Sequence, residues 1–274
     1  MTRCDLCFHH CELSVGQTGF CRARINRHGV IESLTRNTVV SIALDPIEKK
    51  PLAYFYPSSM ILSLGSTGCN LRCPFCQNHA ISMAEHDPAA VRDLPPQEAV
   101  DLALSLVSRG NLGIAFTYNE PLINIEYVEE TAQLAKAAGL KTVLVTNGTA
   151  EEAVIRRLLP LIDAYNIDLK GFTPQFYRKL QGDLDSVKRT IALCVSHAHV
   201  EITTLVIDGE NDNDVDIDAM AQWLASLDPD IPLHLTRFFP HYLWMDKQRT
   251  SIETLRRLQR IAQKHLRRVQ LGNV

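Results

Sequence analysis

The chain has 274 residues, of which 46% are hydrophobic and 22% are charged, and its formal net charge is −3 at pH 7. This is the composition of a folded globular protein, and the charge gives no electrostatic reason to expect binding to nucleic acid or to an anionic membrane. No apolar run reaches the roughly 18 residues that span a membrane, and the first residues, MTRCDLCFHHCELS, lack the apolar core of a signal peptide. We therefore expect a cytoplasmic protein whose cysteines are reduced and hold metal.

The first predicted unit is a front segment, residues 1–58, which contains Cys4, Cys7, Cys11 and Cys21. Its glycine-containing turn signals and its lack of a long helical period predict a small module. The four thiols could close a tetrahedral zinc site, in which His9 or His10 could replace one cysteine. Four cysteines suit an auxiliary iron–sulfur cluster equally well, and a segment without metal is the third alternative. We predict that this N-terminal cysteine-rich metal-binding module is followed by a second unit, residues 59–274.

In the second unit, short apolar runs alternate with longer amphipathic stretches. The predicted strands are residues 60–65, 112–118, 141–148, 164–171, 199–207 and 232–239, and the predicted helices are residues 96–110, 124–139, 150–162, 216–227 and 251–266. Such alternation predicts an α/β fold with a parallel sheet and covering helices. An eight-unit barrel typically takes about 250 residues, so about six units indicate a partial barrel or a doubly wound open sheet.

Three of the predicted strands carry polar residues on one face. Strand side chains alternate between faces, so the polar residues in each of these strands lie opposite its apolar ones. The polar positions are Asn166, Asp168, Lys170, Glu201, Thr203, His234 and Thr236. One explanation is a set of edge strands with a wet face. The other is a polar interior that binds a polar ligand.

Three more cysteines, Cys69, Cys73 and Cys76, are spaced C-x3-C-x2-C directly after the first strand of the second unit. A structural zinc site normally has four protein ligands, and this group has three. Iron–sulfur clusters are also held by thiolates, ordinarily four for a cubane. The spacing therefore favours a cluster with one iron left open for a small-molecule ligand.

Together with Phe75 before the last cysteine, this spacing resembles the signature of the radical S-adenosylmethionine (SAM) superfamily. The resemblance implies a partial (β/α)6 TIM-like barrel in residues 59–274. It also implies that Cys69, Cys73 and Cys76 hold a [4Fe–4S] cluster whose fourth iron binds SAM. An external reductant such as flavodoxin or ferredoxin would then allow SAM to be cleaved to a 5′-deoxyadenosyl radical, which abstracts hydrogen from a substrate.

The stretch FTYNEP, after the second predicted strand of this unit, is a shorter match to the superfamily. Tyr118 and Asn119 stand where many members have two glycines, and Glu120 keeps its place. The resemblance implies that this part of the chain receives the methionine amino group of SAM. The alternative is a helix start with Pro121 in the first turn.

Two further stretches, VTNG and DLK, are similar to the pyruvate formate-lyase activating enzymes. Val145 departs from that pattern, because those enzymes have an aspartate before TNG. Lys170 would approach the carboxylate of SAM, and Asp168 is its alternative partner. The residues expected to contact the cofactor are Phe75, Asn119, Glu120, Asn147, Asp168, Lys170, Thr203 and His234.

Long runs over nearly the whole chain, including CDLCFHHCELSVGQTGFCRAR, GCNLRCPFCQN and EITTLVIDGEND, resemble the AmmeMemoRadiSam-system radical SAM family. That resemblance implies Memo-like and AMMECR1-like proteins as possible partners. The substrate is either a glycine on a partner protein, as for a glycyl-radical-enzyme activase, or a small molecule. The chain lacks cysteines between residues 76 and 119, so it has no ferredoxin-like insert of the kind seen in many activases. A non-catalytic metal-binding or electron-transfer protein is the distant alternative.

Overall fold

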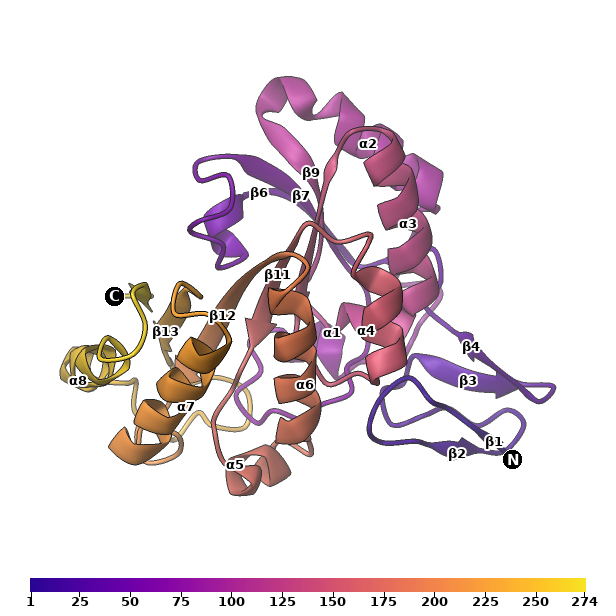
Figure 1. Cartoon of the computed structure of the whole chain (residues 1–274). Helices are drawn as coiled ribbons and strands as arrows, with labels where there is room; N and C mark the ends of the chain where they lie inside the picture. Colours follow the sequence, from indigo (N-terminus) through magenta and orange to yellow (C-terminus); the bar gives the residue numbers. More distant parts are fainter.

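A computed structural model describes all 274 residues, and its main feature is an open sheet of eight strands (Figure 1). The order across the sheet is β14-β13-β12-β11-β10-β9-β7-β6. The strands are β6 (Ser41–Pro46), β7 (Met60–Gly65), β9 (Asn111–Phe116), β10 (Lys141–Thr146), β11 (Ala164–Asp168), β12 (His199–Val206), β13 (Leu233–Arg237) and β14 (Val269–Gly272). Only the β6–β7 pair is antiparallel. The α/β fold with a parallel sheet is confirmed, and all six predicted strands are present in it.

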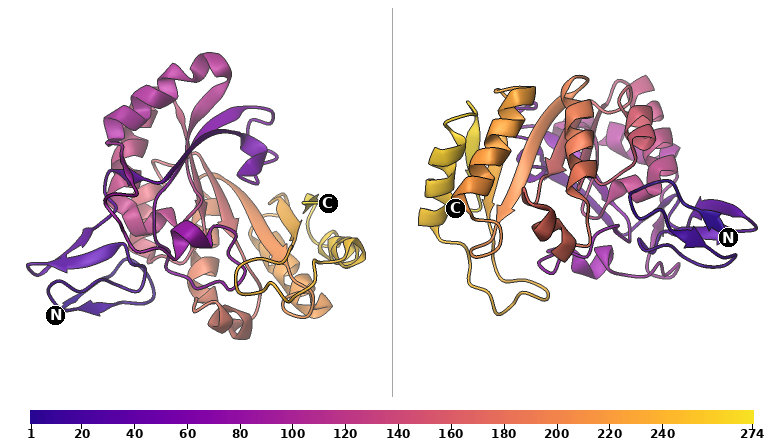
Figure 2. Two further views of the ribbon diagram at one scale, coloured as in Figure 1. Left: turned by 180° about the vertical axis from the view of Figure 1, so that it is seen from behind. Right: turned by 60° about the horizontal axis from the view of Figure 1, so that its bottom comes forward.

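Helices follow the strands and cover one face of the sheet (Figures 1 and 2). They are α1 (His79–Ser82), α2 (Pro96–Ser105), α3 (Ile125–Ala137), α4 (Glu152–Leu158), α5 (Pro174–Lys179), α6 (Leu184–Val195), α7 (Asp214–Leu227) and α8 (Ile252–Ala262), with the short 3-10 helices η1 (Ile47–Lys49), η2 (Val107–Arg109) and η3 (Pro121–Asn124). The start of α8 shows why they form: Ser251 caps the helix by accepting from the Thr254 amide, and Leu255 and Leu258 are buried. No helix is long and apolar enough to cross a membrane.

The face of the sheet away from the helices is polar at several buried positions. Asn166 and Glu201 are fully buried, and β11, β12 and β13 each have a neighbouring strand on both sides. The explanation of the polar faces by wet edge strands is therefore wrong for these three strands. Buried polar side chains require hydrogen-bond partners, and a segment inside the sheet supplies several of them.

This segment, residues 47–55, is called the plug below. Its side chains Ile47, Leu52 and Phe55 pack against inner-face residues of the strands: Ile61, Ala115, Val143 and Ala164. The backbone of the plug also binds the inner face of the sheet, because the Ala53 and Tyr54 amides donate to the Glu201 carboxylate at 3.0 and 2.8 Å. The plug fills this part of the inner face, and a cavity lies beyond it towards the carboxyl ends of the strands.

The front segment forms small antiparallel pairs, β1 (Thr2–Arg3) with β2 (Glu12–Leu13) and β3 (Arg24–Arg27) with β4 (Val30–Ser33), on the side of the sheet away from α8 (Figure 2). The β3–β4 turn has positive φ at both His28 (54°) and Gly29 (91°), which suits a tight hairpin. Arg24 is 5% exposed and donates twice to Glu126 of α3, at 2.6 and 2.8 Å.

Two short strands, β5 (Thr38–Val39) and β8 (Arg92–Asp93), also pair. β6 and the plug, although within residues 1–58, belong to the main sheet by pairing and packing.

Candidate active site

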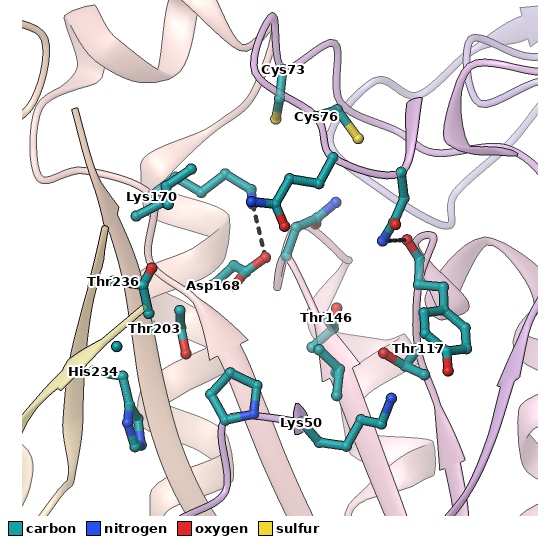
Figure 3. A pocket seen from close by; sticks show the side chains of 18 of the residues that line it. Lys50, Cys73, Cys76, Thr117, Thr146, Asp168, Lys170, Thr203, His234 and Thr236 are labelled. Atoms are coloured by element: carbon teal, nitrogen blue, oxygen red, sulfur yellow. Dashed lines mark hydrogen bonds and ion pairs between the residues drawn. The ribbon is translucent and has the colours of Figure 1, made fainter. Parts of the chain in front are cut away.

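A cavity of about 790 Å³ lies at the carboxyl ends of the strands (Figure 3). Its lining includes every residue outside the front segment that the sequence analysis predicted to hold the cluster or to contact the cofactor: Cys69, Cys73, Phe75, Cys76, Asn119, Glu120, Asn147, Asp168, Lys170, Thr203 and His234. Carboxyl ends of parallel strands meet at one edge, where α/β proteins bind ligands. The structure therefore brings these residues, which are far apart in the sequence, into one site.

The three cysteines lie on the loop between β7 and α1, which is held by its backbone. The Gly68 amide donates to the Ile81 carbonyl at 3.0 Å, and the Arg72 amide donates to the Leu180 carbonyl at 2.8 Å. Gly68 has φ +89°, and a Cβ there would lie 2.5 Å from the Cys21 carbonyl oxygen. Only glycine fits this position, where the front segment touches the cysteine loop.

Two asparagines predicted as cofactor contacts hold the same loop. Asn119 accepts from the Ser66 amide at 3.0 Å and donates to the Gly68 carbonyl at 3.1 Å. Asn147 donates to Asn70 Oδ1 at 2.8 Å. These amides tie the carboxyl ends of β9 and β10 to the residues on either side of Cys69.

Glu120 is 1% exposed, and its carboxylate accepts three hydrogen bonds. The donors are the Leu122 amide at 3.0 Å, the Thr146 hydroxyl at 2.7 Å and the Asn147 amide at 2.7 Å. Burial raises the pKa of Glu120 to about 7, although these hydrogen bonds act in the opposite direction. Glu120 caps η3 and Pro121 begins it, which is the helix-start arrangement considered above. The contact between Glu120 and the methionine amino group stays a prediction.

Tyr118 has a left-handed backbone, φ +71°, at a position where many superfamily members have glycine. A side chain in this conformation is strained by roughly 1–2 kcal/mol, and three contacts stabilise it. The Tyr118 hydroxyl donates to Asp45 at 2.5 Å, and the Lys50 ammonium lies 4.4 Å from the ring centroid. The ring also packs on Gly65, where a Cβ would lie 2.8 Å from it. The chain thus keeps the glycine-type turn while adding a side chain to the cavity wall.

An apolar cluster surrounds the cysteine loop: Leu71, Cys73, Phe75, Phe176, Leu180, Ile207 and Phe238. Burial raises the pKa of the Cys73 thiol to about 12, a cost that ligation of a thiolate to iron offsets. No three or more His, Cys, Asp or Glu side chains are grouped so as to hold a single metal ion, here or in the front segment. The three thiols nevertheless open into one cavity, and thiolates are the ligands of iron–sulfur clusters. The donor set therefore fits a cluster.

Lys170 and Asp168 form an ion pair in the middle of the cavity, with Nζ and Oδ2 2.8 Å apart (Figure 3). Burial by itself lowers the pKa of Lys170, but the charges of Asp168 and Cys73 raise it overall. The lysine is therefore a fixed cation. The alternative partner named from the sequence is present, and a further contact with the cofactor carboxylate stays a prediction.

Several lining residues were missed by the sequence analysis: Lys50, Thr117, Thr146 and Gln270. Thr146 lies within the VTNG stretch and could have been found from it. Lys50 carried no signal, because it comes from the front of the chain and pairs with Asp45 at 2.8 Å.

Below the cavity, Glu201 joins two histidines and the plug. Its oxygens lie 2.6 Å from His234 Nε2 and 2.8 Å from His199 Nε2, and they also accept from the Ala53 and Tyr54 amides. Burial would raise the pKa of Glu201, but these four donors hold it at about 2. Glu201 is therefore an ionised carboxylate inside the sheet.

An α/β sheet that carries a three-cysteine loop at the carboxyl end of its first parallel strand defines a class of iron–sulfur enzymes. Residues 64–221 match the sequence model of the radical SAM superfamily, and the chain belongs to this superfamily. Its members are enzymes, and membership implies a [4Fe–4S] cluster and SAM. Neither zinc nor the narrower AmmeMemoRadiSam assignment follows from this match.

Among individual proteins, the chain is 38% identical to the uncharacterized protein MJ0808 of Methanocaldococcus jannaschii, over 99% of this chain and 81% of that protein. It is 30% identical to GTP 3′,8-cyclase of Peptoclostridium acidaminophilum, over 54% of this chain and 46% of that protein. A domain of pyruvate-formate lyase-activating enzyme from Bacteroides vulgatus superposes with a TM-score of 0.51 at 20% identity, covering 59% of this chain and 99% of that one. The last comparison shows a shared fold only.

The Glu201 network predicts a pH-dependent contribution to stability. The pKa of Glu201 falls from 4.5 to about 2 on folding, so its contribution is present above pH 4.5 and is lost as the pH falls towards 2. Glu201→Gln should lower the free energy of unfolding by about 3 kcal/mol at pH 7. The deficit relative to wild type should shrink in urea titrations at pH 4 and pH 3. The exposed Glu253→Gln is the control, and an equal deficit at all three pH values would contradict the prediction.

Proposed function

We propose that this protein cleaves SAM reductively at a [4Fe–4S] cluster held by Cys69, Cys73 and Cys76, and abstracts hydrogen from a substrate bound in the same cavity. The observation that carries the proposal is that these three thiols and the Asp168–Lys170 pair open into one cavity at the carboxyl edge of the sheet. The open, helix-covered sheet supports the interpretation of residues 59–274 as a partial (β/α)6 barrel. An electron carrier without catalysis needs no such cavity.

The bound cluster and SAM would supply the 5′-deoxyadenosyl radical, and the protein would position them and exclude water. Lys170 would pair with the SAM carboxylate, while Asp168 keeps it oriented. Phe75, which is 4% exposed, would shield the cluster side from solvent. Asn119, Asn147 and Glu120 would act mainly by fixing the backbone around the cofactor. An external reductant such as flavodoxin or ferredoxin would supply the electron, which suits an anaerobic, cytoplasmic protein.

Two substrate classes fit this proposal. The shared fold with a pyruvate-formate lyase-activating enzyme supports a glycyl-radical-enzyme activase, whose substrate is a glycine on another protein. The local similarity to GTP 3′,8-cyclase supports a small molecule, and we favour this class because the cavity continues past Asp168 and Lys170 into a polar end. Memo-like and AMMECR1-like proteins are proposed as partners on the sequence resemblance alone.

The cluster assignment predicts the outcome of Cys73→Ala. After anaerobic reconstitution, wild type should bind about four irons at this site, and dithionite should give a reduced-cluster signal that SAM alters. Cys73→Ala should lose the signal, because one of three ligands is missing. Cys194→Ala, which changes a buried cysteine away from the loop, should keep it. Zinc alone in this site under iron-replete, anaerobic conditions would refute the assignment.

The role of Lys170 predicts a loss of SAM affinity in Lys170→Met, which keeps much of the length and removes the charge. A charged hydrogen bond contributes about 1.5–3 kcal/mol, or about ten- to hundredfold in affinity. Anaerobic titration of the cluster-loaded variant should show this loss while the cluster remains assembled. Lys179→Met is the control, because Lys179 is half exposed and pairs with Glu210. Unchanged affinity and unchanged formation of 5′-deoxyadenosine would remove Lys170 from the SAM site.

For the front segment we propose a structural zinc ion held by Cys4, Cys7, Cys11 and Cys21. The Phe20 amide donates to Cys11 Sγ at 3.5 Å. Burial raises the pKa of Cys4, Cys7 and Cys21, and the nearby backbone of Leu6, His9 and Ala23 acts in the opposite direction. Such donors stabilise thiolates, the form that binds metal. The four thiols have to draw together on binding, since they are not grouped around one ion in this structure.

This zinc proposal predicts that Cys7→Ser lowers the zinc content and the thermal stability without removing the response of the core cluster to SAM. Metal analysis, calorimetry and the reduced-cluster signal of the same sample measure the three properties. Cys194→Ser again serves as the control. Loss of an iron–sulfur spectrum on changing only the front cysteines would show an auxiliary cluster instead of zinc.

A further inference from the structure

The cavity has two ends, and the proposed function uses residues of only one of them for the cluster and SAM. Thr203 and His234, which the sequence analysis predicted as cofactor contacts, lie at the other end and are proposed here as substrate contacts instead. The cysteines lie at one end, and the Asp168–Lys170 pair separates them from the opposite end, which we call the far end (Figure 3). The far end is lined by Lys50, Thr203, His234 and Thr236. Lys50 is paired with Asp45, so the far end offers hydrogen bonds rather than an unpaired charge.

Thr203 and His234 are neighbours by strand register. Thr203 of β12 is aligned with Asp168 of β11 on one side and with His234 of β13 on the other. Aligned residues of adjacent strands point to the same face, roughly 4.8 Å apart. The row therefore places a hydroxyl beside an imidazole inside the cavity.

Glu201 determines which ring nitrogen of His234 carries a proton. Glu201 is fully buried, and its Oε2 lies 2.6 Å from His234 Nε2. An ionised carboxylate only accepts hydrogen bonds, so Nε2 carries the proton. His234 Nδ1 has no hydrogen-bond partner in the protein, and the His234 side chain lines the cavity. With Nε2 donating to Glu201, the neutral tautomer of His234 has Nδ1 as its acceptor, and His234 lines the cavity.

Thr203 presents the complementary group. Its Oγ1 accepts a hydrogen bond from Asn166 Nδ2 at 2.8 Å, and Asn166 is held by a second hydrogen bond to the Pro51 carbonyl at 3.0 Å. The hydroxyl proton of Thr203 makes no hydrogen bond to the protein and remains available to a ligand. The far end thus combines one free acceptor with one free donor.

We propose that the far end binds an alcohol group of the substrate, whose O–H donates to His234 Nδ1 and whose oxygen accepts from Thr203 Oγ1. This inference rests on the proposed function, which it deepens by naming a substrate class. An alcohol satisfies both groups with one atom. An ammonium only donates and a carboxylate only accepts, so each leaves one buried group unpaired. Glu201 is a positioning residue for His234 in this subsite.

The first test is the protonation state of His234. In cluster-loaded, SAM-bound protein with ¹⁵N-labelled histidine, the ring nitrogen signals of His234 should show a protonated Nε2 and a bare Nδ1. Glu201→Gln should change this pattern, a readout that a merely structural role for Glu201 would not move. A proton on Nδ1 in the wild-type protein overturns the proposal.

The second test compares three probes with the same carbon skeleton: 1-propanol, propylammonium and propionate. The alcohol should shift the His234 Nδ1 signal saturably and bind about tenfold tighter than the two ions, because each ion leaves a polar group unpaired. Thr203→Val and His234→Gln should each abolish this selectivity. If one of these variants fails to fold, the other still tests the proposal. Tighter binding of either ion, or no saturable shift with the alcohol, overturns the proposal.

A cluster-free Cys73→Ala sample separates this inference from the proposed function. The probe selectivity should persist in it, since the hydrogen bonds of Thr203 and His234 go to Asn166 and Glu201 and not to the cysteine loop. If wild type assembles the cluster and cleaves SAM but shows no alcohol selectivity, the subsite alone is refuted. If wild type assembles no cluster, the proposed function fails whatever the probes show.

Discussion

Every polar group buried on the inner face of the sheet needs a hydrogen-bond partner, and the rest of the structure depends on this requirement. Glu201 shows how it is met, because two histidines and two amides of the plug donate to one carboxylate. Asn166 in turn donates to Pro51. The plug is thereby held inside the sheet by hydrogen bonds as well as by its apolar side chains. The cavity is the remaining part of the inner face, where some polar groups are left for ligands.

The same requirement fixes the cysteine loop. Loops at the carboxyl ends of strands are mobile unless their polar groups are bound. Here Asn119 and Asn147 bind the loop from the ends of β9 and β10, and Asn70 of the loop donates to the Thr149 carbonyl. Tyr118 adds a tie to the opposite wall through Asp45. A site that must hold a cluster and a cofactor in one geometry benefits from such preorganisation, because little ordering remains to be done on binding. The side chains that position the loop are thus as much a part of the site as the thiols.

The division of the cavity into two ends suggests how one superfamily fold can serve different substrates. The cysteine end carries the groups expected for a shared cofactor, whereas the far end is built by Lys50, Thr203 and His234 from strands β12 and β13 and from the plug region. Function resides in such local sites rather than in the fold as a whole. In our proposal, the polar row from Asp168 to His234 joins the cofactor end to the substrate end of the cavity.

The strands, the position of the three cysteines at the cavity and the superfamily were predictable because each depends on a short pattern: alternation of apolar runs, a C-x3-C-x2-C spacing, and polar residues at every second strand position. Lys170 and Asp168 could be paired from their spacing of two residues, although β11 ends at Asp168 and Lys170 lies beyond the strand. The Glu201 contacts with Ala53 and Tyr54 could not, because they join residues 148 and 147 positions apart. Nor did any pattern show that Tyr118 keeps a left-handed backbone while bonding Asp45, or that His234 lines the cavity with Nδ1 unpaired. Local patterns in the sequence determined which polar residues line the site. Only the tertiary structure decided which of their atoms remain available to a ligand, because hydrogen bonds to distant segments occupy the other atoms.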